Sequence, residues 1–582
     1  MSRNHIIDSL TFSVICITWL SLSQFDNLIL KTVISIVIVI HLLENFRNNS
    51  PSTLPNVFIF GLMIRFFNQS YSSFDELLTT DAALDYLMVN ILLSERELLV
   101  IDHIIYDERV SFYSSWPLLH YLLATFHELT GSNSLELSIN IAQIGIYFGS
   151  FMALSAIVNW FKENSTIPIS NIPVCIFIAI SIPELVYWQS EVVRQSLGVF
   201  FHFFFILGIL HIFNGQNKLT MTFLVIISTI GLSFAHHLTS AVSLVSFSAS
   251  LALGVFIVFF FSSTDFDRNQ RESLRDSVNL IVIFAIMIIL WWAVIGEVLF
   301  PTIRGAVNRY YLIITGVLQY VNDPRISVPD ELSPLWVEIS LASRDFIIYV
   351  GTAIGFVLMA YRDQSRIQNF NNLLFYSLVF GYVAASFFLL FFGEFSRVLV
   401  FASPFMAVSW CYLAVPTDKE HDSKWLHSGI LIILIVSFVS PYNHTFANVY
   451  YYDDSISANE AGRPSSGYSE ATDFAMEHSP SSFEIGTDLV EFALMSANSP
   501  EEVFRFQSLI LSISKNSSGV HYNDTKDIVL LIRDGGLFQY NVRSEFRLNL
   551  NDLDIAKSEI NHSLQENRSK IYDSSEGIGV WI

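Results

Sequence analysis

The chain has 582 residues, of which 52% are hydrophobic and 14% are charged, and its mean hydropathy is +0.48. A soluble protein of this length carries more charge and fewer apolar residues, so the composition excludes that class and predicts a polytopic membrane protein. The formal net charge of −22 also excludes a general nucleic-acid-binding role, because binding a phosphate backbone requires a basic surface.

Apolar runs of roughly 17 to 25 residues, long enough to cross a bilayer as helices, recur through the chain. We expect about thirteen transmembrane helices by this criterion. They lie near residues 9–23, 29–43, 55–67, 135–160, 168–185, 196–213, 219–236, 238–262, 277–299, 346–361, 373–392, 398–415 and 427–440. The first run resembles a signal peptide, but no small-residue cleavage site follows it, so we count it as a span.

Positive charges between these spans fall on alternate loops, which predicts that those loops are cytoplasmic. The residues concerned are Arg47, Lys162, Lys218, Arg268, Arg271, Arg275, Arg362, Arg366, Lys419 and Lys424. The other loops are then extracytoplasmic, including a long polar first external loop at residues 68–115. The helix expected at Trp116 to Leu129 is too short for a full span, so we expect it to lie at the interface or enter only partly.

The composition becomes polar and acidic after Ser440. The runs FEIGTD and DIVLLIR predict short strands, whereas Ser466 to Met476 and Glu501 to Ser512 predict helices. We therefore expect a transmembrane catalytic domain at residues 1–440 and a small extracytoplasmic α/β domain at residues 441–582.

The three cysteines, Cys16, Cys175 and Cys411, all lie within apolar runs. A disulfide framework or a zinc site is therefore improbable, and we expect buried small apolar side chains.

Charged and imidazole side chains gather at the predicted outer ends of otherwise apolar helices. They are Glu184, Glu191, Arg194, His236, His237, Glu297, Arg304, Glu394 and Arg397. Such groups are costly in lipid and usually face a wet cavity or one another. The set predicts a polar crevice at the outer interface, although each residue could also simply mark where a helix emerges.

Two carboxylates in the first external loop are candidate catalytic groups. Asp81 and Asp85 are four residues apart in TTDAALDYLM, which places them on one face if the segment is helical. Transfer of a sugar from a lipid phosphate needs a carboxylate that takes the proton of the acceptor hydroxyl. Asp81 is the first choice for this general base, and Asp85 supports or replaces it. A solvated helix with acids in its first turn explains the pattern equally well.

The departing phosphate needs cations, and Arg194 and Arg397 suit this role because a guanidinium stays charged and grips two oxygens. Local ion pairs with Glu191 and Glu394 are an equally simple reading of both arginines. His236 and His237 could donate to a phosphate or a sugar hydroxyl. Two adjacent histidines do not make a metal site without a nearby carboxylate, so no metal is assigned.

The chain resembles the GT-C superfamily of integral-membrane glycosyltransferases, in particular the archaeal enzymes that use dolichyl-phosphate sugars. The resemblance lies in the acidic first loop with Asp81 and Asp85, in SSWPLLHYLLATFHELTG and in GEFSRVLVFASP. It implies a GT-C-like fold, an inverting hexosyltransferase and, as substrate-binding residues, His120 and Glu394 beside Arg194, His236, His237 and Arg397. It leaves a divalent cation open.

The expected function is transfer of a sugar from a polyprenyl (dolichyl) phosphate to a lipid-linked or protein-linked glycan on the outer face of the cell membrane. The external domain has no WWD triplet, which favours a monosaccharide transferase over an oligosaccharyltransferase. The partners would be the lipid donor, the glycan or glycoprotein acceptor and membrane lipid, with no nucleic acid. A glycolipid transporter or flippase, or a polysaccharide polymerase or ligase, is the alternative.

Overall fold

A computed structural model describes part of the chain. The described residues are 3–23, 28–48, 50–70, 80–95, 116–131, 135–165, 172–190, 192–215, 217–261, 268–295, 343–344, 346–362, 370–390, 397–413, 484–487, 506–508, 510–514, 517–521, 528–533, 570–573 and 578–581. The chain divides into two compact units, the first comprising residues 1–68, 134–324 and 333–447, and the second residues 69–133, 325–332 and 448–582. The boundary expected at residue 440 stays a prediction.

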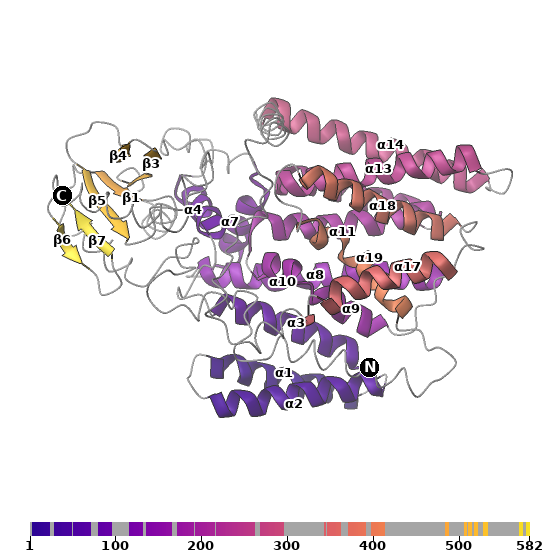
Figure 1. The fold of residues 1–582 in the computed structure, drawn as a ribbon, viewed down its shortest axis with the longest axis horizontal. Coiled ribbons are helices and arrows are strands. Elements are labelled where there is room, and N and C mark those ends of the chain that lie inside the picture. The colour runs from indigo at the N-terminus through magenta and orange to yellow at the C-terminus, as the bar shows by residue number, and fades with distance from the viewer. Residues whose placement is uncertain are drawn as a thin grey trace. The chain divides into compact units, whose positions relative to one another are not determined.

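The first unit is a bundle of helices (Figure 1). Its α-helices are α1 (Arg3–Ser23), α2 (Leu28–Arg47), α3 (Thr53–Ser70), α8 (Leu135–Asn164), α9 (Ile172–Ile180), α10 (Pro183–Gln189), α11 (Arg194–Phe213), α12 (Lys218–Ala235), α13 (His237–Phe261), α14 (Arg268–Leu290), α17 (Gly351–Arg362), α18 (Phe370–Leu390) and α19 (Arg397–Leu413). Two π-helical turns, η1 (Trp291–Ile295) and η2 (Phe346–Val350), adjoin α14 and α17.

These helices overlap every expected span except 427–440, which lies outside the described residues. Five of them contain segments long and apolar enough to cross a membrane, and three shorter segments are also apolar. The long segments are Leu137–Asn164, Arg194–Phe213, Lys218–Ala235, His237–Phe256 and Arg275–Ala293. The chain is therefore a helical membrane protein, while the count of about thirteen spans stays a prediction.

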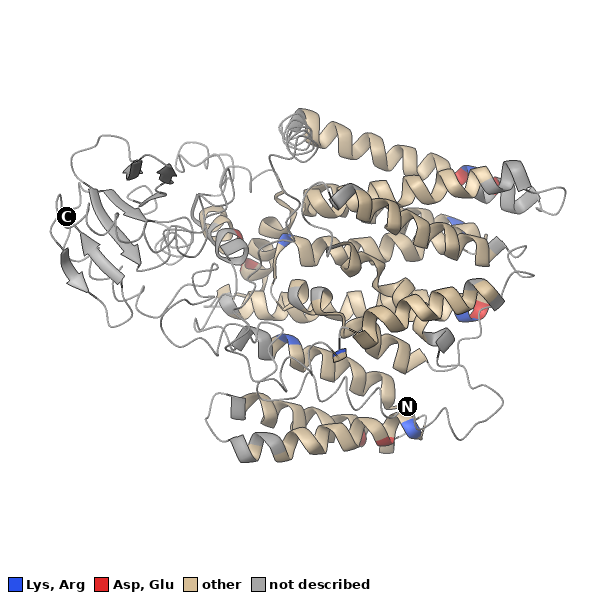
Figure 2. Ribbon diagram, in the orientation of Figure 1, with Lys and Arg blue, Asp and Glu red and all other residues tan. Residues whose placement is uncertain are grey.

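The outer surfaces of the bundle are apolar. On α1, for example, Ile6, Leu10 and Val14 follow at intervals of four residues, and all three are at least half exposed. Charged residues are sparse along the described helices of this unit (Figure 2). Exposed apolar stripes of this kind suit contact with lipid rather than water.

The expected span at 168–185 is not continuous. It consists of α9 and α10, which are separated at Ser181 and Ile182, and Pro183 begins α10. A proline has no N–H to continue the helical ladder, and it disfavours the helical conformation of the residue before it. The prediction of one unbroken helix is therefore wrong at this position.

Helices α13 and α18 pack against each other through small side chains (Figure 1). A Cβ atom added to Gly381 would lie 2.1 Å from the backbone oxygen of Ser246 and 2.1 Å from Oγ of Ser250. Ser246 and Ser250 are one turn apart on α13, so only a glycine allows the backbone of α18 to come this close. Small residues commonly permit such close helix packing in membranes.

In the second unit, α4 (Thr80–Glu95) and α7 (Leu118–Thr130) pack against each other. The short helix expected at 116–129 is confirmed by α7, whose buried residues include Leu119, His120 and Leu123. Gly131 ends this helix with φ of 60°, a left-handed conformation that glycine adopts without strain. The helix α4 confirms that Asp81 and Asp85 share a helical segment.

The other elements that the structure describes in this unit are β-strands. A five-stranded sheet has the order β2-β1-β5-β7-β6, with β1 parallel to β2 and β5, and β7 antiparallel to β5 and β6. A separate antiparallel hairpin joins β3 to β4. The strands are β1 (Glu484–Thr487), β2 (Phe506–Ser508), β3 (Ile510–Ser514), β4 (Ser517–His521), β5 (Ile528–Arg533), β6 (Lys570–Asp573) and β7 (Ile578–Trp581).

Two of these strands were expected and one expected helix is wrong. The motif FEIGTD contains β1, and DIVLLIR contains β5, as predicted. The segment Glu501 to Ser512, expected as a helix, contains β2 and the start of β3 instead. The strand β3 ends in LSIS, an alternation of apolar and polar residues that suits a half-buried strand. The helix expected at Ser466 to Met476 lies outside the described residues.

Candidate functional site

Asp85 and His120 form a buried pair in the second unit. The Nε2 atom of His120 donates to Oδ1 of Asp85 at 2.8 Å, and the two side chains are 0% and 1% exposed. The pair joins α4 to α7. Because both side chains are inaccessible to water, Asp85 is better suited to a supporting role than to direct contact with a substrate.

Asp81 belongs to the first turn of α4, four residues before Asp85. Its side chain is outside the described part of the structure. A role as the general base therefore remains a proposal, and the Asp85–His120 pair is a contact that joins its helix to α7.

Arg194 is the first residue of α11, and its side chain is buried. The turn before it is fixed by Ser196, whose hydroxyl accepts from the Val193 N–H at 3.1 Å and donates to the Val193 carbonyl at 2.6 Å. The first of these bonds satisfies the Val193 N–H at the start of the helix, where N–H groups have no partner within the helix itself.

His236 is buried between α12 and α13, and His237 begins α13. The backbone N–H of Thr239 donates to Nδ1 of His236 at 3.3 Å. Since Nδ1 accepts this bond, the proton of the neutral ring lies on Nε2, which is then the donor. The centroids of the His236 and His237 rings are 4.7 Å apart.

Arg194 and His236 lie at the same end of the bundle. A Cβ atom added to Gly198, one turn after Arg194, would lie 2.7 Å from Oγ1 of Thr239, which follows His236 by three residues. The first turns of α11 and α13 therefore pack against each other. The structure thus places two of the residues that the sequence singled out at the same end of the bundle.

The opposite end of the bundle is marked by three asparagines. The Asn214 side chain, just after α11, donates to the side chain of Asn164 at the end of α8. The Asn371 side chain, in the first turn of α18, donates to the carbonyl of Asn164 at 2.6 Å. Helix α11 therefore runs from the Arg194 end to this asparagine end.

Arg397 begins α19, whose position follows from two ring contacts. The Phe401 ring lies 5.1 Å from that of His202, near the middle of α11, and Phe405 lies 6.1 Å from Phe161, close to the asparagine end. Helix α19 therefore runs in the same direction as α11, with Arg397 toward the Arg194 end. The Arg397 side chain and Glu394 lie outside the described part.

A buried polar cluster that the sequence did not single out lies deeper in the bundle. Ser243 donates to the Thr239 carbonyl at 2.7 Å, so its oxygen accepts from Nδ1 of His202 at 2.7 Å, and Nε2 of His202 accepts from the Tyr382 hydroxyl at 2.7 Å. The cluster links α11, α13 and α18. A histidine and a tyrosine within apolar runs were the available signal, but their pairing was not visible in the sequence.

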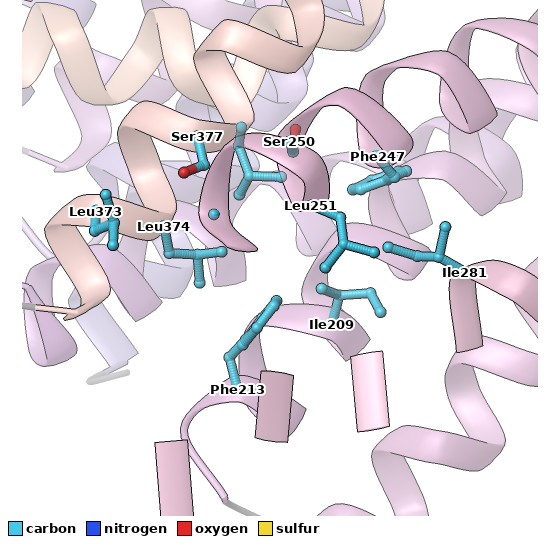
Figure 3. A pocket seen from close by; sticks show the side chains of 11 residues that line it. Ile209, Phe213, Phe247, Ser250, Leu251, Ile281, Leu373, Leu374 and Ser377 are labelled. Carbon is cyan, nitrogen blue, oxygen red and sulfur yellow. The ribbon is translucent and has the colours of Figure 1, made fainter. Parts of the chain in front are cut away.

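An apolar pocket lies among α11, α13, α14 and α18 (Figure 3). Ser250 and Ser377 are the polar side chains among its lining residues, and Phe213, the last residue of α11, places it toward the asparagine end. None of the predicted site residues whose side chains the structure describes lines it. This pocket is therefore not the polar crevice that we expected.

Cys175 on α9 is disulfide-bonded, whereas Cys16 is free and buried. The expectation that the cysteines are simple apolar residues is therefore wrong at Cys175. Spacing along the chain cannot show which cysteines approach each other in three dimensions.

Within the described residues, no group of three His, Cys, Asp or Glu side chains converges as metal ligands would. Asp85 and His120 are of the right types, but no third such group joins them among the described residues. The described side chains thus do not complete a cation site, and no step is derived through a metal ion.

No family model matches the chain. No curated protein matches it either. Among solved structures, it is similar to the Archaeoglobus fulgidus oligosaccharyltransferase tethered to an acceptor peptide containing the NVT sequon, with 14% identity over 78% of this chain and a TM-score of 0.45. The same enzyme in complex with Zn and sulfate gives 14% identity over 78% of the chain and a TM-score of 0.46.

A third similar structure is the archaeal oligosaccharyltransferase AglB from Archaeoglobus fulgidus in complex with an inhibitory peptide and a dolichol-phosphate. The identity is 13% over 76% of the chain, with a TM-score of 0.46. The chain spans 64%, 61% and 63% of the lengths of these three structures.

Proposed function

We propose that this chain is a membrane glycosyltransferase. It transfers a single sugar, by inversion, from a polyprenyl (dolichyl) phosphate to a lipid-linked or protein-linked glycan on the outer face of the cell membrane. The observation that carries the proposal is the packing of Gly198 against Thr239, because it gathers Arg194 and His236 at one end of a bundle that is otherwise apolar.

The chemistry of this end suits an anionic headgroup on a lipid. A guanidinium and an imidazole Nε2–H are both donors, and Arg397 begins a helix that points the same way. Donors and cations placed where negative charge grows stabilise a departing phosphate. A membrane-embedded bundle also gives a hydrophobic donor lipid direct access from the bilayer.

In the proposed reaction, Asp81 takes the proton from the acceptor hydroxyl. The acceptor oxygen forms a bond to the anomeric carbon while the bond from that carbon to the phosphate oxygen breaks. The electron pair leaves with the polyprenyl phosphate, whose growing charge Arg194 and Arg397 stabilise, with His236 and His237 as further donors. Asp85 and His120 hold α4, and Glu394 is assigned to substrate binding.

A glycolipid flippase is the second candidate, because the structure contains a feature that transporters use. The chain is interrupted twice between α9 and α11, at Ser181 to Ile182 and again before Arg194. Discontinuous helices of this kind often line transport sites.

Glycans from a strain that lacks the gene distinguish the two candidates. The glycosyltransferase predicts glycans that are one sugar shorter, restored by the wild-type gene but not by Asp81→Asn at equal protein levels. Full-length glycan that accumulates unflipped on its lipid, with normal complementation by Asp81→Asn, would favour the flippase and remove Asp81 from the base role.

A further inference from the structure

Arg65 is a charged side chain enclosed entirely within the first unit. It belongs to α3 and is 0% exposed. Burying a guanidinium in a membrane protein is costly, so such residues are usually functional and satisfied by specific partners. No ion pair with Asp or Glu involves Arg65 among the residues that the structure describes, so neutral groups hold its charge.

Those neutral groups are the ends of the interrupted helices. Nε and Nη2 of Arg65 donate to Oε1 of Gln189 at 3.1 and 2.7 Å, and Nη2 also donates to the Ile180 carbonyl at 3.4 Å. Ile180 ends α9 and Gln189 ends α10. Carbonyls at helix C-termini lack partners within the helix and carry partial negative charge, which suits a cation.

The guanidinium is also fixed from its own helix and from α8. Nη1 donates to the Gly61 carbonyl at 2.9 Å, and the guanidinium carbon lies 4.2 Å from the centre of the Tyr147 ring. A Cβ atom on Gly61 would lie 2.1 Å from the Tyr147 hydroxyl oxygen. The absence of a side chain at Gly61 therefore makes room for the ring on which the guanidinium rests.

Gln143 on α8 holds the same break from another side. Its Nε2 donates to the carbonyls of Gln189 at 3.3 Å and Ser190 at 2.7 Å. Ser190 is buried and donates to the Val186 carbonyl. Arg65 and Gln143 thus bind the last residues of α10, and Arg194 follows Ser190 by four residues.

We propose that Arg65 and Gln143 are positioning residues that hold the C-terminal end of α10, at Gln189 and Ser190, and thereby set the place of Arg194 for the donor phosphate. The inference rests on the proposed function for its effect on sugar transfer. The hydrogen bonds of Arg65 and Gln143 to Gln189 and Ser190, which we call the clamp, do not depend on that function. A planar guanidinium is needed because it reaches Gln189 and two backbone carbonyls simultaneously, which an ammonium cannot do.

The first experiment compares Arg65→Gln, Arg65→Lys and Gln143→Leu with Arg47→Gln, a matched control at an exposed arginine in the last turn of α2. Transfer rates are measured against dolichyl-phosphate-sugar concentration with purified protein. The clamp predicts that Arg65→Gln, Arg65→Lys and Gln143→Leu each raise the donor KM about tenfold while kcat and the acceptor KM stay near wild type. A donor KM near that of wild type in Arg65→Lys overturns the inference. A decrease in kcat together with equal changes in the donor KM and the acceptor KM overturns it as well.

The second experiment does not depend on sugar transfer. A cysteine replaces Val192, which is 6% exposed, and its labelling by a water-soluble maleimide is followed over time, with the unmodified chain as blank. Labelling should be slow alone and with Arg47→Gln, but at least about tenfold faster with Arg65→Gln or Gln143→Leu. Unchanged labelling in these two variants overturns the clamp. If the wild-type protein had no transferase activity, the proposed function would be contradicted, but the labelling experiment would still test the clamp.

Discussion

Nε2 of His120 donates to Oδ1 of Asp85 at 2.8 Å, and neither side chain is exposed to water. Removing one partner deprives a buried polar group of this hydrogen bond, which costs about 1 to 3 kcal/mol. We expect His120→Leu and Asp85→Leu each to lower the thermal unfolding midpoint in detergent, and the double variant to be less destabilised than the sum. Additive losses would show that the two residues do not act as a pair.

Arg194 should contribute to donor binding rather than to acceptor binding. Arg194→Ala is expected to raise the KM for the dolichyl-phosphate sugar, with a smaller effect for Arg194→Lys because a point charge lacks the bidentate fork. Arg397→Ala should act in the same direction. Initial rates at varied donor and varied acceptor separate these effects, and a defect confined to the acceptor KM would refute the phosphate assignment.

The contact of Gly381 with Ser246 predicts a steric effect with an internal control. Gly381→Ala should destabilise the bundle by about 1 to 3 kcal/mol, because its Cβ would overlap the backbone of α13. Gly254→Ala should be close to neutral, since the nearest atom, Oγ of Ser377, would be 3.9 Å away. Thermal unfolding of both variants in the same detergent checks this, and equal midpoints would contradict the packing of α13 on α18.

The His202 cluster predicts a loss of stability. Tyr382→Phe removes the hydroxyl that donates to Nε2 of His202 and should cost about 1 kcal/mol. Tyr361→Phe, at an exposed tyrosine of α17, is the matched control. Unfolding midpoints that do not distinguish the two variants would show that the hydrogen bond contributes nothing measurable.

Hydropathy predicts the helices well because a segment that crosses lipid must satisfy its backbone hydrogen bonds internally. A long apolar run does this by forming a helix. Pro183 is a sequence signal for the break before it, but the apolar residues around it favour the prediction of a single span. In the C-terminal part, DIVLLIR predicts the strand that the structure contains, whereas Glu501 to Ser512 predicts a helix wrongly because its polar residues also fit a helical face.

The site was only partly predictable. Asp85, His120, Arg194 and His236 could be singled out by residue type in an apolar context, but the pairing of Asp85 with His120 and the placement of Arg194 and His236 at one end of the bundle depend on helix packing. Arg65 lies inside the expected span at 55–67 and is not among the predicted site residues, although a charge at such a position is a strong signal of function. The disulfide at Cys175 depends on a contact that spacing along the chain does not reveal.

The central claim is transfer of a sugar from a lipid phosphate by this chain, and purified protein in liposomes tests it most directly. Radiolabelled dolichyl-phosphate hexose and a glycan acceptor are supplied, and labelled acceptor is counted for wild type and for Asp81→Asn. The account predicts transfer by the wild type and its near-complete loss in Asp81→Asn at equal folded protein. Equal transfer by both, or none by the wild type with any dolichyl-phosphate sugar, would contradict it.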